Sequence, residues 1–367
     1  MVVESDSSNS RRSRIDRLRL FFSELRADAL LISHPANIRY LCGFSGSAGL
    51  LLVEASGSVL FTDSRYTFQA REEVSGARIH IAKKGLLRAA GGTLQSRKGR
   101  LSVGFSSSHL TVAQMAVLRS ASGGRVRWAT DANTVEKLRA AKDDQEVATM
   151  REAAILISKV FESTLPSIEP GISELELAGQ LELTMKRLGA SGPSFETIVA
   201  SGARSAWAHA HPTPKPLRKG ELVVMDQGAI LHGYCSDMTR TVFLGHAPQK
   251  VRRLYRAVLE AQEAAKKAIR PGVTAGAVDA AARGVLKQYG LAKYFTHSTG
   301  HGLGLEVHEM PRIGRGEKFI IQKGMVLTVE PGVYLEGLGG IRIEDDVVVT
   351  ETGSLDLTTA SREFLEL

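Results

Sequence analysis

The sequence predicts an α/β domain followed by an α+β domain. Helix-like and strand-like segments alternate up to about Ala129, whereas later helices and strands are interspersed without regular βαβ order. The length of 367 residues fits about two domains, at roughly 150 residues each. We expect a disordered leader over residues 1–14, a first domain over 15–135 and a second domain over 136–367.

The composition is that of a globular protein, with 43% hydrophobic and 23% charged residues. The net charge of +8 is uneven, because the first 140 residues carry 21 Lys and Arg against 11 Asp and Glu. These basic residues are scattered rather than aligned, so we expect a solvated surface and no nucleic-acid partner. No stretch approaches 18 apolar residues, so we expect no membrane partner.

Cysteine usage points to a reducing compartment. Cys42 and Cys235 are far apart in the sequence and form no CxxC motif, which excludes a disulfide framework and a zinc ribbon. Arg11-Arg12 resembles a twin-arginine signal only superficially, because charged residues follow where an apolar segment would begin. We therefore predict a cytoplasmic protein.

The first part begins with an amphipathic pattern. Ile15, Leu18, Phe22 and Leu25 recur at helical spacing and form one face. Apolar runs predict strands over residues 29–33, 49–53 and 59–62, the last two joined by the turn Ala55-Ser56-Gly57.

The second part has longer helical segments. Helices are predicted over residues 136–161, 173–188, 249–269 and 279–289. Ser173 and Glu176 have the spacing of a capping box, which marks the start of the second of these helices. Strands are predicted over residues 221–225, 239–244, 325–329 and 341–350.

Several common catalytic motifs are excluded. The glycine-rich segment 300–304 lacks the strand–turn–helix setting of a dinucleotide loop, and the one at 43–49 lacks the lysine of a phosphate loop. There is no GxSxG, and His308-Glu309 is not followed by the second histidine of HExxH.

What remains is a set of acidic residues and one histidine at the edges of strand-like runs: Asp226, Asp237, His301, Glu330 and Glu344. A carboxylate at the end of a buried strand is costly unless it is paired or binds a cation. Four carboxylates and one imidazole could bind two divalent ions, which suits Mn²⁺ or Co²⁺, with Zn²⁺ and Fe²⁺ as alternatives.

Each residue also has a structural interpretation when it is taken alone. Asp226 and Glu330 are alternatively turn or cap residues. The other two carboxylates have arginines nearby, and Arg240 and Arg342 are their alternative partners.

The order and spacing of these segments resemble one family. Met225–Ala229, Ser236–Thr241, His297–Gly304, Thr328–Gly332 and Arg342–Asp345 resemble the ligand segments of the M24 "pita-bread" metallopeptidases, in the Xaa-Pro aminopeptidase and Xaa-Pro dipeptidase branch. Asn37–Ser47 and Phe61–Tyr66 resemble the creatinase/prolidase N-terminal domain. The resemblance implies a creatinase-like α/β N-terminal domain, an α+β pita-bread catalytic domain and a homodimer.

The resemblance also implies roles for the five donors. Asp226 would chelate one metal ion, Asp237 and Glu344 would bridge two, and His301 and Glu330 would complete the second site. Glu330 would in addition act as general base. The implied cofactor is two divalent ions per chain, with Mn²⁺ preferred.

Other residues fall near the substrate in this resemblance. His308 would contact the substrate carbonyl, and His209 would be the second substrate-side histidine, with His211 as an alternative to it. His297, Arg312 and Arg342 are candidates for substrate binding or for supporting the ligands, and structural ion pairs are the alternative for both arginines. Relatives often carry proline before the substrate-side histidine, whereas this chain has Ala208, which bears on substrate preference.

We therefore predict a metal-dependent Xaa-Pro aminopeptidase acting on proline-containing peptides. The alternative within the family is an Xaa-Pro dipeptidase. A non-catalytic pita-bread binding protein should have lost at least one ligand, and a creatinase-like hydrolase lacks this set. A methionine aminopeptidase usually lacks the N-terminal domain.

Overall fold

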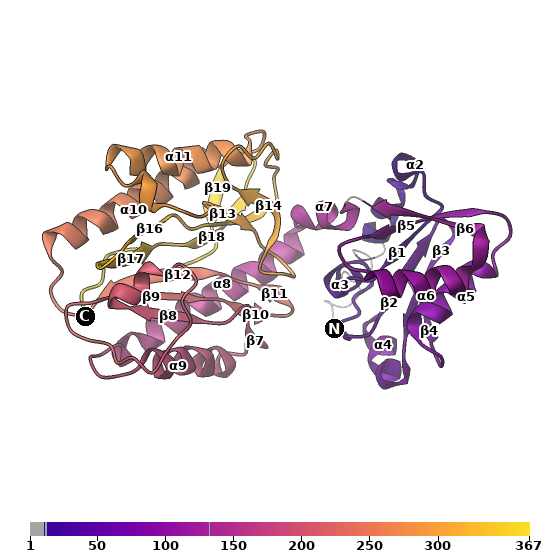
Figure 1. The fold of residues 1–367 in the computed structure, drawn as a ribbon, viewed down its shortest axis with the longest axis horizontal. Helices are drawn as coiled ribbons and strands as arrows, with labels where there is room; N and C mark the ends of the chain where they lie inside the picture. The colour runs from indigo at the N-terminus through magenta and orange to yellow at the C-terminus, as the bar shows by residue number, and fades with distance from the viewer. Residues whose placement is uncertain (1–10, 12, 132) are drawn as a thin grey trace. The chain divides into compact units, whose positions relative to one another are not determined.

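The computed structural model describes residues 11, 13–131 and 133–367. The chain divides into two compact units, unit 1 up to Arg139 and unit 2 from Ala140 to Leu367 (Figure 1). The boundary that we expected after residue 135 falls inside helix α7 (Thr134–Ala140).

Most of the expected leader, residues 1–10 and 12, lies outside the described residues. Its last two residues, however, are helical. Arg14 is buried and donates from Nη1 to the carbonyl of Tyr40 at 3.2 Å. Ile15 and Leu18 on the same helix are buried as predicted. Unit 1 therefore begins earlier than the sequence pattern suggested.

Unit 1 is built on a six-stranded mixed sheet in the order β4-β3-β2-β1-β5-β6. The strands are β1 (Ala29–Ile32), β2 (Leu50–Glu54), β3 (Gly57–Thr62), β4 (Arg78–Ile81), β5 (Leu101–Ser106) and β6 (Val126–Asp131). The three predicted strands are present as β1, β2 and β3. β1 is antiparallel to β2 and parallel to β5, and the consecutive parallel pairs β3–β4 and β5–β6 require crossover connections.

The helices of unit 1 are α3 (Pro35–Cys42), α4 (Thr67–Glu73), α5 (Leu86–Gln95) and α6 (Val112–Ser122), and the short α2 (Phe22–Leu25) precedes β1. α4 connects the parallel strands β3 and β4, and α6 connects the parallel strands β5 and β6. α5 and α6 lie side by side across one face of the sheet (Figure 1). Alternate residues of the strands, such as Leu50 and Leu52 of β2, point to that face and are buried against Ala90 and Leu94 of α5.

Unit 2 contains four long helices, α8 (Asp144–Thr164), α9 (Glu174–Arg187), α10 (Gln249–Ala268) and α11 (Ala275–Gln288). Ser173 caps α9 in a capping box with Glu176, as predicted. The single helix predicted over 136–161 is wrong, because α7 and α8 are separate. Asp143 begins α8 with its own capping box to Glu146. α11 begins four residues before the prediction, since Thr274 caps it.

The strands of unit 2 form small antiparallel sheets held between the helix pairs α8/α9 and α10/α11 (Figure 1). The strands are β7 (Gly192–Pro193), β8 (Ile198–Ser201), β9 (Leu222–Gln227), β10 (Ala229–Leu231), β11 (Tyr234–Cys235), β12 (Met238–Phe243), β13 (Gly300–Gly302), β14 (Glu309–Ile313), β15 (Val326–Val329), β16 (Gly332–Leu335), β17 (Gly339–Arg342), β18 (Asp345–Val349) and β19 (Ser354–Asp356). One sheet has the order β12-β9-β8 and another the order β14-β13-β15-β18-β19.

The strand predicted over 341–350 is two strands. β17 pairs with β16, whereas β18 pairs with β15 and β19, so the chain changes sheet at Ile343-Glu344. Two apolar cores lie on either side, one around α8 and α9 and the other around α10 and α11. These cores support the strands in or next to which Asp226, Asp237, His301, Glu330 and Glu344 lie.

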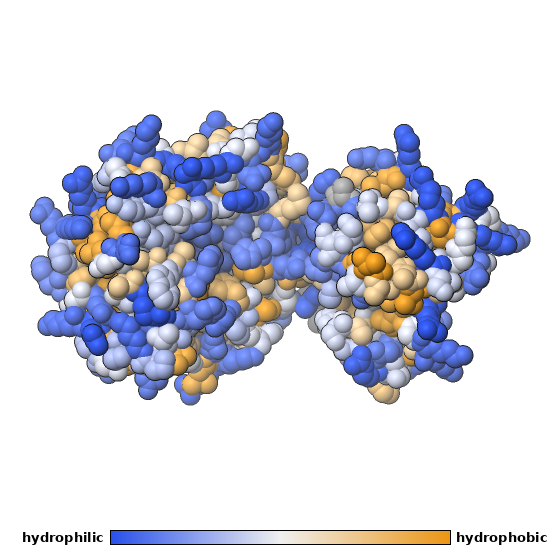
Figure 2. All heavy atoms as spheres, in the orientation of Figure 1, coloured by the Kyte–Doolittle hydropathy of each residue, from blue (hydrophilic) through white to orange (hydrophobic). Residues whose placement is uncertain are grey.

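On the face that Figure 2 shows, hydrophilic residues cover much of each unit, with apolar residues between them. The most exposed large apolar side chains are Val112, Leu20 and Phe68 in unit 1 and Trp207 in unit 2. Within the described ranges, no helix is both long and apolar enough to cross a membrane. Cys42 and Cys235 are buried free thiols in different units.

Candidate metal centre

Neighbouring strands bring the five candidate ligands together. Asp226 lies in β9, and Asp237 directly precedes β12, which pairs antiparallel with β9. His301 lies in β13, and Glu330 directly follows β15, the neighbour of β13. Glu344 lies at the change of sheet just before β18, which pairs with β15. All five side chains line one cavity of about 250 Å³ in unit 2.

The imidazole of His301 presents one nitrogen to the carboxylates. Its Nδ1 lies 3.0 Å from the carbonyl of Gly302, which assigns the proton to Nδ1. Nε2 then has a free lone pair, 3.7 Å from Asp237 Oδ2 and 3.6 Å from Glu330 Oε1. Burial, followed by the neighbouring His308, lowers the pKa of His301 to about 4. The ring is therefore neutral at pH 7, as a metal ligand must be.

The carboxylates are crowded and buried. Burial, and then the charge of Glu344, raises the pKa of Asp237 well above its ordinary value. Burial, and then Glu330, does the same to the pKa of Glu344. The pKa of Glu330 is raised to about 8, again mainly by burial. So many carboxylates are unfavourable together unless protons or cations neutralise them.

Unsatisfied oxygens support cations as the neutralising species. Oδ1 of Asp226 and Oδ1 of Asp237 are buried and have no hydrogen-bond partner among the described residues. Ligand atoms of Asp237, His301 and Glu344 all lie within 4.8 Å of one another. An oxygen-rich set with one imidazole fits divalent ions such as Mn²⁺ or Co²⁺.

Arg342 does not line the cavity but supports the candidate ligands through hydrogen bonds. Its side chain is only 4% exposed, and Nη2 lies 2.6 Å from Asp226 Oδ2. Nε donates to Thr239 Oγ1 at 3.0 Å, and that hydroxyl donates to Glu344 Oε2 at 2.6 Å. Arg342 therefore orients two candidate ligands, one directly and one through Thr239. Arg240, the other arginine considered as a partner of Asp237 or Glu344, pairs with Asp345 instead.

His297 belongs to the same supporting network. Its Nδ1 lies 2.8 Å from the carbonyl of Ser298, so Nε2 accepts the hydroxyl of Tyr334 at 2.8 Å. Tyr334 in turn accepts a hydrogen bond from Nη1 of Arg342 at 2.7 Å. His297 Nδ1 is 3.8 Å from Glu330 Oε2. It therefore sits behind Glu330 rather than beside the other donor atoms.

The sequence analysis missed Thr239, Thr328 and Tyr334. Strand alternation could have found the two threonines, because each lies two residues from a predicted ligand, and residues at this spacing point to the same side of an extended chain. Thr328 accepts from the backbone N–H of His301 and lies 3.5 Å from Glu330. Nothing in the local sequence distinguished Tyr334, since its partners are distant in the chain.

Three histidines lie at the open side of the cavity. His308 is exposed, and its ring centroid is 4.4 Å from that of His301. Burial, and then His209, lowers the pKa of His308, which places His209 nearby. His209 and His211 also line the cavity. His211 is paired with Glu196 through Nδ1 at 3.0 Å.

Arg312 lies elsewhere. It is exposed, does not line the cavity, and donates from Nε to Ser298 Oγ at 2.7 Å. Its link to the site runs through the segment that carries His297.

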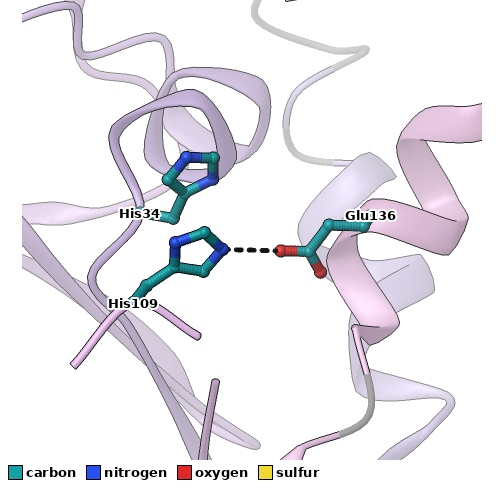
Figure 3. A group of neighbouring side chains, drawn as sticks. All are labelled: His34, His109 and Glu136. Carbon is teal, nitrogen blue, oxygen red and sulfur yellow. Dashed lines mark ion pairs between the residues drawn. The ribbon is translucent and has the colours of Figure 1, made fainter. Parts of the chain in front are cut away.

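A second cluster of possible metal donors lies in unit 1. Figure 3 shows His34 and His109 stacked, with ring centroids 3.8 Å apart and planes 11° from parallel, and His109 Nε2 3.5 Å from Glu136 Oε1. Asn37 donates to the same oxygen at 2.7 Å. Lone pairs of ring nitrogens lie in the ring planes, so stacked parallel rings do not direct them to one point. The geometry is that of packing and pairing, not of a metal site.

The sequence matches agree with this geometry. Residues 148–351 match metallopeptidase family M24, and residues 14–141 match the creatinase/prolidase N-terminal domain. The chain therefore belongs to metallopeptidase family M24. This confirms the resemblance and the expected fold class.

Relatives with similar sequences cover nearly the whole chain. An uncharacterized peptidase, YqhT of Bacillus subtilis, is 39% identical over 96% of this chain and 100% of its own length. An Xaa-Pro dipeptidase of Pyrococcus furiosus is 35% identical over 96% of this chain and 100% of its own length.

Two solved structures are also similar. An Xaa-Pro dipeptidase from Bacillus anthracis superimposes with a TM-score of 0.94 at 36% identity, covering 97% of this chain and 100% of its own. An X-Pro aminopeptidase from Thermotoga maritima gives a TM-score of 0.89 at 36% identity, covering 96% of this chain and 100% of its own.

Proposed function

We propose that this metallopeptidase hydrolyses Xaa-Pro peptide bonds with two divalent ions held by Asp226, Asp237, His301, Glu330 and Glu344. The observation that carries the proposal is the position of His301, whose Nε2 lies 3.7 Å from Asp237 Oδ2 and 3.6 Å from Glu330 Oε1. The names of the P. furiosus and T. maritima proteins support the choice of the Xaa-Pro bond.

Each side chain has a task in this hydrolysis. When bound, divalent ions supply Lewis acidity, which acidifies a water molecule and polarises the carbonyl that it attacks. Glu330, whose carboxylate lines the cavity, accepts a proton from the attacking water and returns it to the leaving proline nitrogen. His308 and His209, on the open side, donate hydrogen bonds to the oxygen that becomes negative.

The length of the substrate divides two candidates. Among the described residues that line the cavity there is no lysine or arginine to bind the carboxylate of a dipeptide. This favours an aminopeptidase, whose longer substrates extend away from the site. The relatives named Xaa-Pro dipeptidase favour the second candidate.

Parallel assays separate these candidates. We expect the Mn²⁺-loaded protein to cleave Ala-Pro-Ala-Ala with a higher kcat/KM than Ala-Pro. A reversed preference would establish the dipeptidase. Binding of both peptides without turnover would instead support a non-catalytic binding protein.

Metal dependence is tested on the same substrates. We expect chelation to abolish turnover and Mn²⁺ or Co²⁺ to restore it, with two ions per chain by elemental analysis. Full activity of protein shown to be metal-free would overturn the mechanism. The homodimer implied by the family resemblance is part of the proposal, and light scattering should give twice the 39.6 kDa of one chain.

A further inference from the structure

Among the carboxylates that line the cavity, one stands apart from the candidate metal centre. Asp226, Asp237, Glu330 and Glu344 belong to the proposed ligand set. The remaining one is Glu196, whose side chain is 69% exposed. It lies in the segment leading into β8, which is at the opposite edge of the β12-β9-β8 sheet from β12. Its charge is therefore available to a ligand at the mouth of the cavity.

The wall beside Glu196 is apolar. Phe195, Ile198 and Val307 line the same cavity and are partly buried. An apolar wall that ends in a carboxylate matches an amphipathic side chain, in which a methylene stem carries a cationic head. Lysine and arginine have this form.

The present partner of Glu196 does not block such a ligand. His211 Nδ1 lies 3.0 Å from Glu196 Oε1, but its side chain is 76% exposed. A pair between two exposed side chains contributes little. A guanidinium is permanently charged and can bond a carboxylate through two parallel N–H groups, so it can displace the imidazole.

We propose that Glu196 forms the acidic end of a subsite for the residue before proline and that it selects lysine or arginine there. The inference rests on the proposed Xaa-Pro activity. Proline itself has an apolar ring and cannot use a carboxylate, so the side chain of the first residue is the matching partner. The preferred substrates are then peptides that begin Arg-Pro or Lys-Pro.

The test compares Arg-Pro-Ala with citrulline-Pro-Ala, which has nearly the same shape but no charge. We expect the wild type to favour arginine over citrulline by about 5- to 10-fold in kcat/KM. This corresponds to a contact that is stronger than an exposed ion pair and weaker than a buried bidentate charged hydrogen bond. Glu196→Gln should bring this ratio close to one, and Glu196→Lys should invert it. Glu169→Gln removes an exposed charge away from the cavity and should keep the wild-type ratio.

The outcomes separate this inference from the activity on which it rests. If no Xaa-Pro peptide is cleaved, including Ala-Pro-Ala, the proposed function fails. If Ala-Pro-Ala is cleaved but arginine and citrulline substrates react equally, only the subsite is wrong. The same arginine-to-citrulline ratio of kcat/KM can be measured with Ala-Pro-Arg and Ala-Pro-citrulline. If Glu196→Gln changes the ratio for these peptides but not for those with arginine or citrulline first, the assignment is overturned. Glu196 would then bind the residue after proline. Circular dichroism on each variant checks that it is folded.

Discussion

At the scale of single residues, Glu330 combines two functions, because its carboxylate is both a proposed ligand and the proposed base. Glu330→Gln keeps the shape but cannot accept a proton. We expect turnover to fall roughly 10²- to 10⁴-fold, the usual contribution of general acid–base catalysis. Steady-state kinetics and metal content should be measured on the same sample.

The matched control is Glu336→Gln, in the exposed turn between β16 and β17. It should retain the wild-type rate. A Glu330→Gln protein that turns over at the same rate as this control would remove Glu330 from the mechanism. Loss of metal together with activity would assign it mainly as a ligand.

His301 and His308 are close neighbours with different proposed roles. His301→Ala should lose bound metal, because it deletes a proposed ligand. His308→Ala should keep two ions and lose about 10²- to 10³-fold in kcat, as when one oxyanion donor is removed. Metal analysis, kcat and melting temperature on both variants test this division. Equal metal loss in the two variants would contradict it.

At the scale of helices and strands, chain breaks were harder to predict than the elements themselves. Strong periodicity located β9, β12, β15, α9 and α10, since burial on one face imposes it. The predicted helix over 136–161 is interrupted at Asp143, where Asp143 and Glu146 have the spacing of a capping box. The helical pattern on both sides of Asp143 is continuous, so this signal did not stand out. The change of sheet at Glu344 depends on which strands pair, and pairing across the chain leaves little local signal.

Pairing between distant segments also decides which residues of the candidate site could be predicted from the sequence. The proposed ligands could be selected because acids at the ends of apolar strands are chemically conspicuous, and because their order and spacing resemble the M24 segments. Tyr334 acts through partners brought together by folding, so its role emerged only in three dimensions. Arg342 was a candidate from the sequence, but its partner Asp226 is distant in the chain and was not predicted.

β18 begins with a buried carboxylate that stabilises the sheet from behind the site. Asp345 accepts from Arg240 Nη2 at 2.8 Å and from Lys266 Nζ at 3.0 Å. Burial alone would raise the pKa of Asp345, but these cations outweigh it and lower the pKa. Asp345→Asn leaves the buried Arg240 without its counter-charge, so we expect a loss of about 3–5 kcal/mol in the free energy of unfolding.

Denaturant unfolding of the Asp345→Asn protein measures this loss. Asp356→Asn is a suitable comparison, because Asp356 pairs with the same Lys266 but is more exposed. It should cost less than about 1 kcal/mol. Equal effects of the two substitutions would show that burial of the charge is not what matters.

At the scale of the whole molecule, the acidic cluster should make stability depend on pH in metal-free protein, and bound metal should remove that dependence. In metal-free protein the raised pKa values of Asp237, Glu344 and Glu330 mean that the folded state binds more protons than the unfolded state. His297 and His301, whose pKa values burial lowers to about 4, oppose this trend below the ordinary histidine pKa of 6.5. Stability should therefore fall as pH rises from about 6.5 to about 8, the pKa of Glu330. We expect the melting temperature of metal-free protein to be lower at pH 8 than at pH 6.5 by roughly 5 °C or more.

Saturating Mn²⁺ should remove this trend, because cations replace the protons and stabilise the folded state by mass action. Calorimetry at both pH values, with and without Mn²⁺, measures the effect. A metal-free protein that is more stable at pH 8 would show that the carboxylates are ionised without cations. Glu330→Gln should reduce the slope in metal-free protein.

The change of sheet at Glu344 has a consequence for how the protein is assembled. The donors come from strands in separate sheets, and the segments 226–237 and 330–344 contribute only two each. Bringing Asp226 and Glu344 together closes a long loop of chain, which costs conformational entropy. An ion cannot offset that cost before the strands that carry its ligands have paired. We therefore expect the proposed ions to bind only after these strands have paired, so that a bound ion would report a completely assembled unit 2.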